Sequence, residues 1–175
     1  MLIVAGPVFT PITLQPVTLR VAPTDEGARQ ATTRLVRAIL EYSRWPNRQQ
    51  PIRLCSVGPA LYSSAPPTLA LGDGRSLSHR RINAGDLASA KSCDALYLGS
   101  IGVERMRAWN AAVRGTAVLT IAENDPDCAS EAMFCVIYST AANGSREISF
   151  EINSDAVARS QVRIDPRVLR FSAGV

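Results

Sequence analysis

Histidine, aromatic side chains and long hydrophobic runs are all scarce in this sequence. One histidine, His79, stands among 175 residues, and it cannot by itself complete a metal site. Aromatic residues make up only 6% of the chain and are not interleaved with basic ones, which argues against stacking on nucleic-acid bases. No stretch reaches the roughly 18 to 20 consecutive apolar residues that a membrane span needs, so we expect no direct membrane insertion.

The composition that remains is that of a globular domain. Hydrophobic residues account for 46% and charged residues for 19%, and a length of 175 residues fits one domain. The net charge of +4 arises from 19 basic and 15 acidic residues. The basic residues are scattered, with the densest run at His79, Arg80 and Arg81, whereas a nucleic-acid binder clusters them on one face. We therefore expect no nucleic-acid partner.

The first 23 residues differ from the rest. Met1 to Phe9 is apolar but is broken by Gly6 and Pro7, and further prolines follow. We interpret residues 1–23 as a leader, either the remnant of a secretion signal or a disordered Pro-rich segment. A single folded domain is expected over residues 24–175.

Helical and strand patterns alternate through the first two thirds of this domain. Thr24 is a suitable N-cap for a helix whose apolar residues recur at helical spacing and which ends before Pro46. A second helical pattern covers Val103 to Val113. This alternation predicts an α/β fold, a three-layer sandwich with a mostly parallel central sheet and helices on both faces. The expected buried strands are Ile52 to Gly58, Asp94 to Gly99 and Thr116 to Ala122.

The last third has a different pattern. Asn143-Gly144 lies between the strand-like runs Phe134 to Tyr138 and Glu147 to Ile152, which is the strongest short signal for an antiparallel hairpin. The sequence therefore predicts a C-terminal hairpin at one edge of the sheet. Further short elements are an edge strand over Leu77 to Ile82 and helices over Ala84 to Ser92 and Asp155 to Ser160.

Four cysteines, at positions 55, 93, 128 and 135, allow complete pairing. Their spacing fits neither a zinc knuckle nor a thioredoxin-type motif. Cys128 and Cys135 close a short loop, while Cys55 and Cys93 accompany two strands that can be neighbours in a parallel sheet. We favour the pairs Cys55–Cys93 and Cys128–Cys135, although four buried free thiols fit the spacing nearly as well.

Signals for catalysis are weak. Gly72-Asp73-Gly74 lacks the glycine spacing of a dinucleotide-binding loop and predicts a turn. No acid–base pair or activated nucleophile is evident, so the sequence predicts neither an enzyme nor a cofactor. An acidic cluster follows the third strand, where open α/β sheets bind ligands, but its spacing does not match a calcium loop and we favour a rigid turn without metal. The cluster consists of Glu123, Asn124, Asp125 and Asp127.

Two side chains have more than one interpretation. Trp45 ends the first helical segment and is either a core residue, which we favour, or an anchor for a partner. Glu151 lies between Phe150 and Ile152 in the final strand. Alternation places Glu151 and Ser149 on the solvent face, where Glu151 could contact a partner.

Several stretches together resemble one known family. In chain order they are Leu40 to Pro46, Leu54-Cys55, Cys93 to Gly99, Ala122 to Cys128, Phe134-Cys135, Ser149 to Asn153, Asp155 to Ser160, Val162 to Ile164 and Val168-Leu169. Their order, spacing and cysteine placement are similar to those of the YfiR family. The resemblance implies a disulfide-stapled α/β sandwich, the bridges Cys55–Cys93 and Cys128–Cys135, and a homodimer.

The function that the resemblance implies is regulation. YfiR-family proteins are periplasmic repressors that bind the periplasmic sensor domain of an inner-membrane diguanylate cyclase. An OmpA-like outer-membrane lipoprotein can sequester the repressor, and the cyclase then makes cyclic di-GMP, which promotes biofilm formation. We therefore expect a non-enzymatic repressor in cyclic di-GMP signalling that acts in the periplasm through protein–protein interaction.

The partner surface is expected in the C-terminal region. We predict contacts from Phe134, Glu151, Val157 and Arg163, near the Cys128–Cys135 loop, with Trp45 as a further anchor. Reduction of the short bridge would loosen the Phe134 region. The sequence departs from the family in its leader, in Ser63 to Gly74, where prolines replace an expected helix, and in a long hairpin loop, Ser139 to Ser145.

The alternative is a periplasmic small-molecule binding module. Its ligand would lie near Glu123, at the carboxyl edge of the sheet, or in a pocket near Trp45. A deep pocket with convergent polar groups would favour this function, and a flat apolar patch would favour the repressor.

Overall fold

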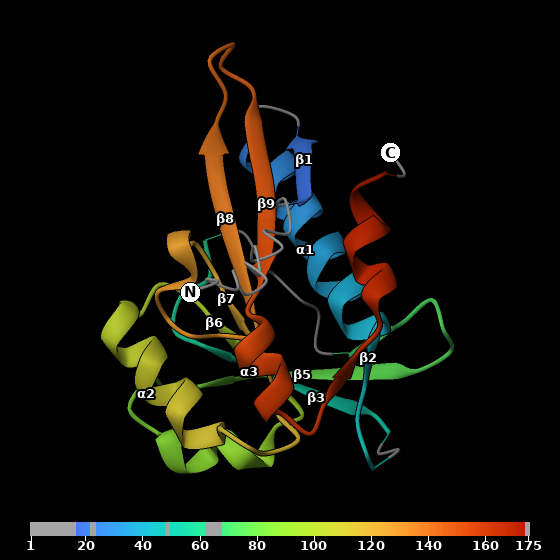
Figure 1. Ribbon diagram of the computed structural model, residues 1–175, viewed down its shortest axis with the longest axis vertical. Helices are drawn as coiled ribbons and strands as arrows, with labels where there is room; N and C mark the ends of the chain where they lie inside the picture. Colours follow the sequence, from blue (N-terminus) through green and yellow to red (C-terminus); the bar gives the residue numbers. More distant parts are fainter. Residues whose placement is uncertain (1–16, 22–23, 48–49, 62–67, 174–175) are drawn as a thin grey trace, which may run out of the picture.

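The computed structural model describes residues 17–21, 24–47, 50–61 and 68–173. They form one eight-stranded sheet and a separate two-stranded ribbon (Figure 1). The strands of the sheet are β1 (Val17–Val21), β3 (Ile52–Val57), β4 (Thr68–Ala70), β5 (Ser76–Ile82), β6 (Ala95–Leu98), β7 (Leu119–Ala122), β8 (Phe134–Thr140) and β9 (Arg146–Ile152). The ribbon pairs β2 (Ser43–Arg44) with β10 (Arg163–Ile164).

The parallel part of the sheet lies in its middle. The strand order is β1-β9-β8-β7-β6-β3-β5-β4. The run from β8 to β5 is parallel, β4 is antiparallel at one end, and β9 and β1 are antiparallel at the other. The predicted α/β fold, with a mostly parallel sheet and an antiparallel C-terminal hairpin, is confirmed. The five parallel strands have the 2-1-3-4-5 order of a doubly wound sheet.

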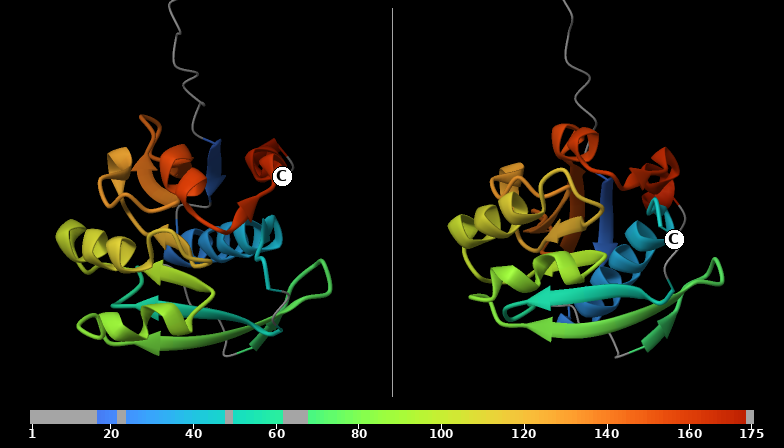
Figure 2. Two further views of the ribbon diagram at one scale, coloured as in Figure 1. Left: turned by 60° about the horizontal axis from the view of Figure 1, so that its bottom comes forward. Right: turned by 90° about the horizontal axis from the view of Figure 1, so that it is seen from below.

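Helices cover both faces of the sheet. The helix α1 (Asp25–Glu41) packs on one face, and the helix α2 (Val103–Val113) with the 3-10 helix η1 (Leu87–Ser92) packs on the other (Figure 1). Strand residues alternate between the two cores, so that Leu54 contributes to the α1 side and Cys55 to the α2 side. Two smaller elements complete the fold: α3 (Ser154–Arg159) and the 3-10 helix η3 (Pro166–Ala173), which lies beside α1 (Figure 2).

The helix α1 begins and ends as its sequence predicts. The Thr24 hydroxyl accepts a hydrogen bond of 3.0 Å from the Gly27 amide, which satisfies one of the free donors of the first turn. Leu35 and Ile39, one turn apart, are fully buried against the sheet. Burial of each such side chain stabilises the fold by roughly 1.5–3 kcal/mol.

The hairpin follows the Asn-Gly signal. Gly144 has φ +81°, a left-handed conformation that glycine adopts without steric cost, and its amide donates to the Ala141 carbonyl at 2.9 Å. The strands continue to Thr140 and Arg146, so the connecting loop is shorter than the expected Ser139 to Ser145.

Four expectations require correction. Val17–Val21, assigned to the leader, forms β1 and pairs with β9, so the sheet begins before Thr24; residues 1–16 lie outside the described residues. β5 is not an edge strand, because β4 pairs with its free side. In Ser63 to Gly74, where we noted that prolines replace an expected helix, Thr68–Ala70 forms the strand β4. Residues 62–67 lie outside the described part. Ser149 is buried rather than on the solvent face.

Both expected disulfides are present. Cys55, in β3, is bonded to Cys93, just before β6, with a Cα–Cα distance of 6.0 Å. Cys128 and Cys135 are bonded with a Cα–Cα distance of 5.3 Å and close the short loop before β8. The free-thiol alternative is thereby excluded for all four cysteines.

Candidate functional site

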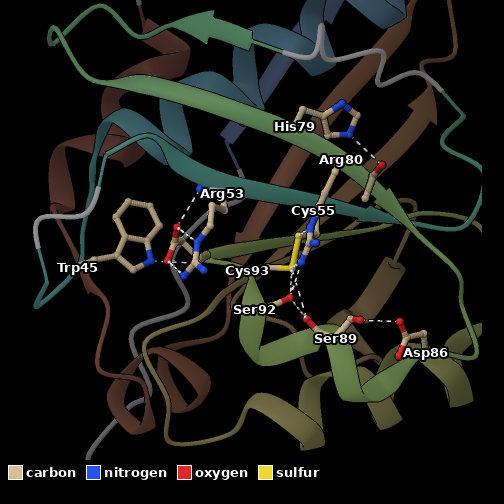
Figure 3. Close-up of a disulfide and its surroundings, with 11 residues drawn as sticks. Trp45, Arg53, Cys55, His79, Arg80, Asp86, Ser89, Ser92 and Cys93 are labelled. Atoms are coloured by element: carbon tan, nitrogen blue, oxygen red, sulfur yellow. Dashed lines mark hydrogen bonds and ion pairs between the residues drawn. A yellow bond between two sulfur atoms is a disulfide. The ribbon is translucent and has the colours of Figure 1, made fainter.

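Trp45 lies where the β2–β10 ribbon meets the amino edge of the parallel strands. Its indole Nε1 donates a hydrogen bond of 2.9 Å to the Asp94 carbonyl oxygen (Figure 3). The Arg75 guanidinium stands over the ring, 5.8 Å from its centroid. The ring packs against the α1-side core but is only half-buried. Trp45 is therefore a core residue that also exposes part of its surface.

Asp94 connects this tryptophan to a second strand. Its carboxylate accepts hydrogen bonds from Arg53 at three positions: the backbone amide at 2.8 Å, Nε at 3.0 Å and Nη2 at 2.9 Å (Figure 3). The hydrogen bond to Asp94 raises the pKa of Arg53. Because Arg53 is in β3 and Asp94 precedes β6, this charge-assisted pair fixes the two strands at their amino ends.

Two hollows flank Trp45. The larger has a volume of about 450 Å³, within the range of small-molecule sites, and the smaller about 190 Å³. The larger is lined by Arg44, Trp45, Asn47, Gln50, Ile52, Asp73, Arg75 and Asp94. The smaller is lined by Trp45, Pro46, Asn47, Arg53, Lys91, Cys93, Asp94, Thr116, Ala117 and Val118. We call these two hollows together the Trp45 site.

The charge of the Trp45 site is predominantly positive. Burial disfavours the Asp73 carboxylate, but the backbone amide and guanidinium of Arg75 outweigh it and lower the Asp73 pKa. Asp73 and Asp94 form ion pairs with Arg75 and Arg53, respectively. The four lining cations are Arg44, Arg53, Arg75 and Lys91. Four cations against two carboxylates leave an excess suited to an acidic partner or ligand.

The Cys55–Cys93 bridge lies behind this site, against an arginine. Arg80 Nε is 3.3 Å from Cys55 Sγ, and its Nη2 is 3.8 Å from Cys93 Sγ and also contacts Ser92 (Figure 3). Both cysteines are buried on the α2 side. The disulfide and the Arg53–Asp94 ion pair therefore both link β3 to the start of β6, at neighbouring positions.

The acidic cluster is divided between two buried positions. The Asp125 carboxylate accepts from the Ser130 amide at 3.2 and 3.3 Å, which holds the loop as the expected turn. Asp125 also lies within 4.8 Å of the sulfurs of Cys128 and Cys135, but these are bonded to each other and offer no thiolate. Glu123 is 1% exposed and accepts from the Leu61 amide and the Tyr138 hydroxyl.

The structure does not bring the predicted partner residues together on one surface. Phe134 is fully buried, 6.0 Å from Phe150 between ring centroids, so it offers no exposed surface to a partner in this conformation. Glu151 of β9 lies opposite Cys135 of β8 in the antiparallel pair, so the two side chains share the α2 face of the sheet. Val157, in contrast, packs against the α1-side core, as Trp45 does.

The ribbon places Arg163 near Trp45 instead. Arg163 of β10 pairs with Arg44 of β2, and Arg44 directly precedes Trp45. Arg163 is exposed. The ribbon thus joins two segments that are far apart in the chain, and the alternation of apolar residues gave no sign of it.

Sequence reasoning missed Arg53, Arg75 and Asp94. The signal for two of them was present: Arg53 and Asp94 are charged residues near the starts of apolar runs that we expected to be parallel neighbours. Opposite charges at the same end of adjacent parallel strands predict an ion pair. Arg75, after a Gly-Asp-Gly turn, gave no such signal.

The fold and disulfides together define a class: a disulfide-stapled α/β domain with a doubly wound parallel sheet and an antiparallel C-terminal hairpin. Within that class, the YfiR/HmsC-like family model matches residues 29–173. The chain therefore belongs to the YfiR/HmsC-like family. Among the described residues, none of the helices is long and apolar enough to cross a membrane.

Proposed function

We propose that this protein is a periplasmic repressor that binds the sensor domain of an inner-membrane diguanylate cyclase and lowers cyclic di-GMP synthesis. The match to the YfiR/HmsC-like family over residues 29–173 carries this proposal. The two disulfides support an oxidising compartment, since such bridges persist in the bacterial periplasm and are rare in the cytosol. The role requires binding and no catalytic step.

Repression of this kind is a difference in affinity. A regulator shifts its target toward the inactive state only by binding that state more tightly than the active one. A shift from 99% active to 99% inactive needs about a 10⁴-fold ratio of the two affinities. An OmpA-like outer-membrane lipoprotein would relieve repression by competing for the repressor, and the repressor would act as a homodimer.

The Trp45 site and the adjoining ribbon are the proposed contact surface. Trp45 combines an exposed apolar face with a rim of arginines, and tryptophan and arginine are the side chains most often found at binding hot spots. Arg163 extends the cationic rim along β10. We expect the complementary surface of the cyclase domain to be acidic. Val157 borders the same side, whereas Glu151 belongs to a second, separate candidate contact on the opposite face.

Deletion of the gene tests the regulatory role. Cellular cyclic di-GMP should rise in the deletion strain and return to the parental level when the wild-type gene is restored. An unchanged level would refute repression by this protein.

Complementation with variants tests the contact surface. Arg163→Glu should leave cyclic di-GMP high, because it reverses an exposed charge of the proposed rim. The matched control is Arg105→Glu, on the exposed side of α2, which should restore the parental level. Equal complementation by the two variants would remove the ribbon from the contact surface.

A small-molecule binding module is the second candidate. The hollow of about 450 Å³ beside Trp45, with convergent arginine and aspartate side chains, favours it. Native mass spectrometry of the protein purified from the periplasm should then show a bound ligand that Trp45→Ala loses. If the native mass of the wild-type protein shows no bound ligand, the result would favour the repressor function over the small-molecule binding module.

A further inference from the structure

A second cavity lies at the opposite end of the parallel strands. It has a volume of about 170 Å³ and is placed at the carboxyl ends of β3, β5 and β6, on the α1 side. The Trp45 site, by contrast, lies at the amino ends of the same strands. The lining residues are Leu54, Ser56, Gly58, Pro59, Ala60, His79, Arg81 and Tyr97. We call this hollow the carboxyl-edge cavity.

Its place in the sheet is where doubly wound folds bind ligands. The chain forms β3 first, adds β5 on one side of it, and then crosses to add β6 on the other side. Such a reversal of strand order opens a crevice at the carboxyl ends of the central strands. The carboxyl-edge cavity lies at this reversal, because its walls come from β3 and from both of its neighbours.

A close approach of two loops forms one wall. The Pro59 carbonyl oxygen is 2.4 Å from the point where a Cβ on residue 99 would stand, so only glycine allows this contact. The segment after β3 thereby packs directly over the end of β6. Backbone packing thus forms this wall, and the side chains of His79, Arg81 and Tyr97 line other parts of the cavity.

The polar groups of the cavity are mostly donors. His79 and Arg81 are two residues apart in β5 and therefore face the same side of the sheet, toward α1. The Ser56 hydroxyl is 2.9 Å from His79 Nε2 (Figure 3). Arg81 is exposed at the mouth, whereas Ser56 is buried.

Tyr97 supplies a buried group that is not satisfied. Tyr97 is 1% exposed, and its hydroxyl lies beside Tyr138 and Glu123 without forming a hydrogen bond of normal geometry within the described residues. A buried hydroxyl without a partner costs about 1–3 kcal/mol. Burial, with the nearby Tyr138 and Glu123, raises the pKa of Tyr97, so this hydroxyl keeps its proton and remains a donor.

The neighbouring carboxylate limits where negative charge can bind. Glu123 is already engaged by the Leu61 amide at 2.7 Å and the Tyr138 hydroxyl at 3.1 Å. An anionic group is therefore favoured at the Arg81 and His79 end of the cavity. The Tyr97 end suits an uncharged acceptor.

We infer that the carboxyl-edge cavity binds a small organic oxyanion, with Arg81 and His79 holding its charged group and Ser56 and Tyr97 donating to its polar end. The volume admits only a compact molecule, below the roughly 300 Å³ of typical drug-sized sites. The inference does not depend on the proposed repressor function, since it concerns the other edge of the sheet.

Titration of the purified protein with two probes tests the site. Succinate represents a carboxylate, and inorganic phosphate represents the free anion, each followed in amide chemical shifts by NMR. Succinate is expected to shift the amides of Ser56, Arg81 and Tyr97 and to saturate. Saturable shifts with phosphate alone would overturn the assignment to an organic ligand, whereas saturation by both probes would support an oxyanion site that accepts a carboxylate.

Variants separate this site from general attraction to a basic protein. Arg81→Gln should weaken succinate binding at least about tenfold, because it removes a charge-assisted contact. Tyr97→Phe should weaken it by a smaller factor and leave the fold intact, since it keeps the buried ring and the hydroxyl makes no hydrogen bond of normal geometry. Arg105→Gln removes the same charge from the exposed side of α2 and should change nothing. Three further results would overturn the inference. They are equal succinate binding by wild type and Arg81→Gln, chemical-shift changes confined to the Trp45 site, and the absence of a saturable shift with either probe.

Discussion

The indole of Trp45 and the main-chain carbonyl of Asp94 are joined by a hydrogen bond of 2.9 Å. The bond ties the segment after α1 to the residue that precedes β6, while the Asp94 carboxylate holds the start of β3 through Arg53. One residue thus connects three segments at the amino edge of the sheet. Changes to this corner are expected to affect stability and binding to different extents.

Replacement of Trp45 separates these effects. Trp45→Phe keeps an aromatic ring but loses the hydrogen bond, so the free energy of unfolding should fall by about 1 kcal/mol. Trp45→Ala also removes the packed ring and should cost about 3 kcal/mol, at the low end for tryptophan because the ring is half-exposed. Urea unfolding measures both. Equal losses for the two variants would show that ring packing contributes little.

Asp94→Ala should be more damaging than loss of an ordinary surface carboxylate. It removes the three hydrogen bonds that the Asp94 carboxylate accepts from Arg53, whose side chain is 40% exposed, for a loss of about 2–3 kcal/mol. Glu104→Ala is the control, because the carboxylate of Glu104 is 81% exposed and its pair with Arg107 should contribute below about 0.5 kcal/mol. Similar unfolding midpoints for the two variants would contradict this role of Asp94.

The two disulfides should contribute unequally. Cys55–Cys93 spans 38 residues and Cys128–Cys135 spans 7. If restriction of the unfolded chain dominates, removal of the longer bridge costs about 4 kcal/mol and removal of the shorter about 2 kcal/mol. Paired Cys→Ala variants, compared by thermal unfolding, measure this order. The reverse order would show that the short bridge acts mainly on the folded state, as expected if its reduction loosens the Phe134 region.

Phe134 should act through folding alone. Its ring is fully buried against Phe150, so Phe134→Ala should destabilise the protein by about 3–5 kcal/mol. Phe134→Leu keeps most of the volume and should cost below about 1.5 kcal/mol. At a temperature where Phe134→Leu remains folded, its affinity for the partner should equal that of wild type. A large loss of affinity without a loss of stability would restore Phe134 to the contact surface.

High pH should destabilise the fold through buried tyrosines. Burial raises the pKa of both Tyr97 and Tyr138 above the ordinary value of 10, so the neutral hydroxyls are favoured in the folded state. Their contribution is fully present below pH 10 and is lost as the pH rises above it, because the unfolded chain then releases these protons more readily.

Unfolding by urea at a series of pH values from neutral to above 10 measures this loss. Tyr138→Phe should show a shallower decline than wild type above pH 10, because it removes one of the two groups. Identical slopes for wild type and variant would contradict the assignment.

The sequence predicted most of the fold because its signals are local. Thr24 marks the start of α1, and Asn143-Gly144 marks the hairpin turn, as the structure shows. Cysteine spacing favoured the observed disulfide pairs but fitted free thiols nearly as well, and the pairing followed from the resemblance to the YfiR family. β1 was missed because its five residues lie in a Pro-rich segment and pair only with a strand more than a hundred residues later. Local patterns carry no information on such a distant pairing.

The candidate site was predicted less well, for the same physical reason. Trp45 was identified as either a core residue or a partner anchor; it packs against the α1-side core and lines the larger hollow, while its contact with a partner stays a prediction. The cations around it arrive from separate loops, and only the folded chain brings Arg75 over the indole ring. The burial of Phe134 was not foreseen, because an aromatic residue beside a disulfide has the same sequence pattern whether it faces solvent or the core.

The pairing of β1 with β9 also bears on how the chain is made. A ribosome or a secretion channel releases the amino end first, so Val17–Val21 emerges long before Arg146–Ile152. Until then β1 has no partner strand, and this edge of the sheet cannot close. The sheet therefore cannot be completed until β9 has been released, and the polypeptide stays incompletely folded during synthesis. A truncation that removes β9 should for this reason be more damaging than its length suggests.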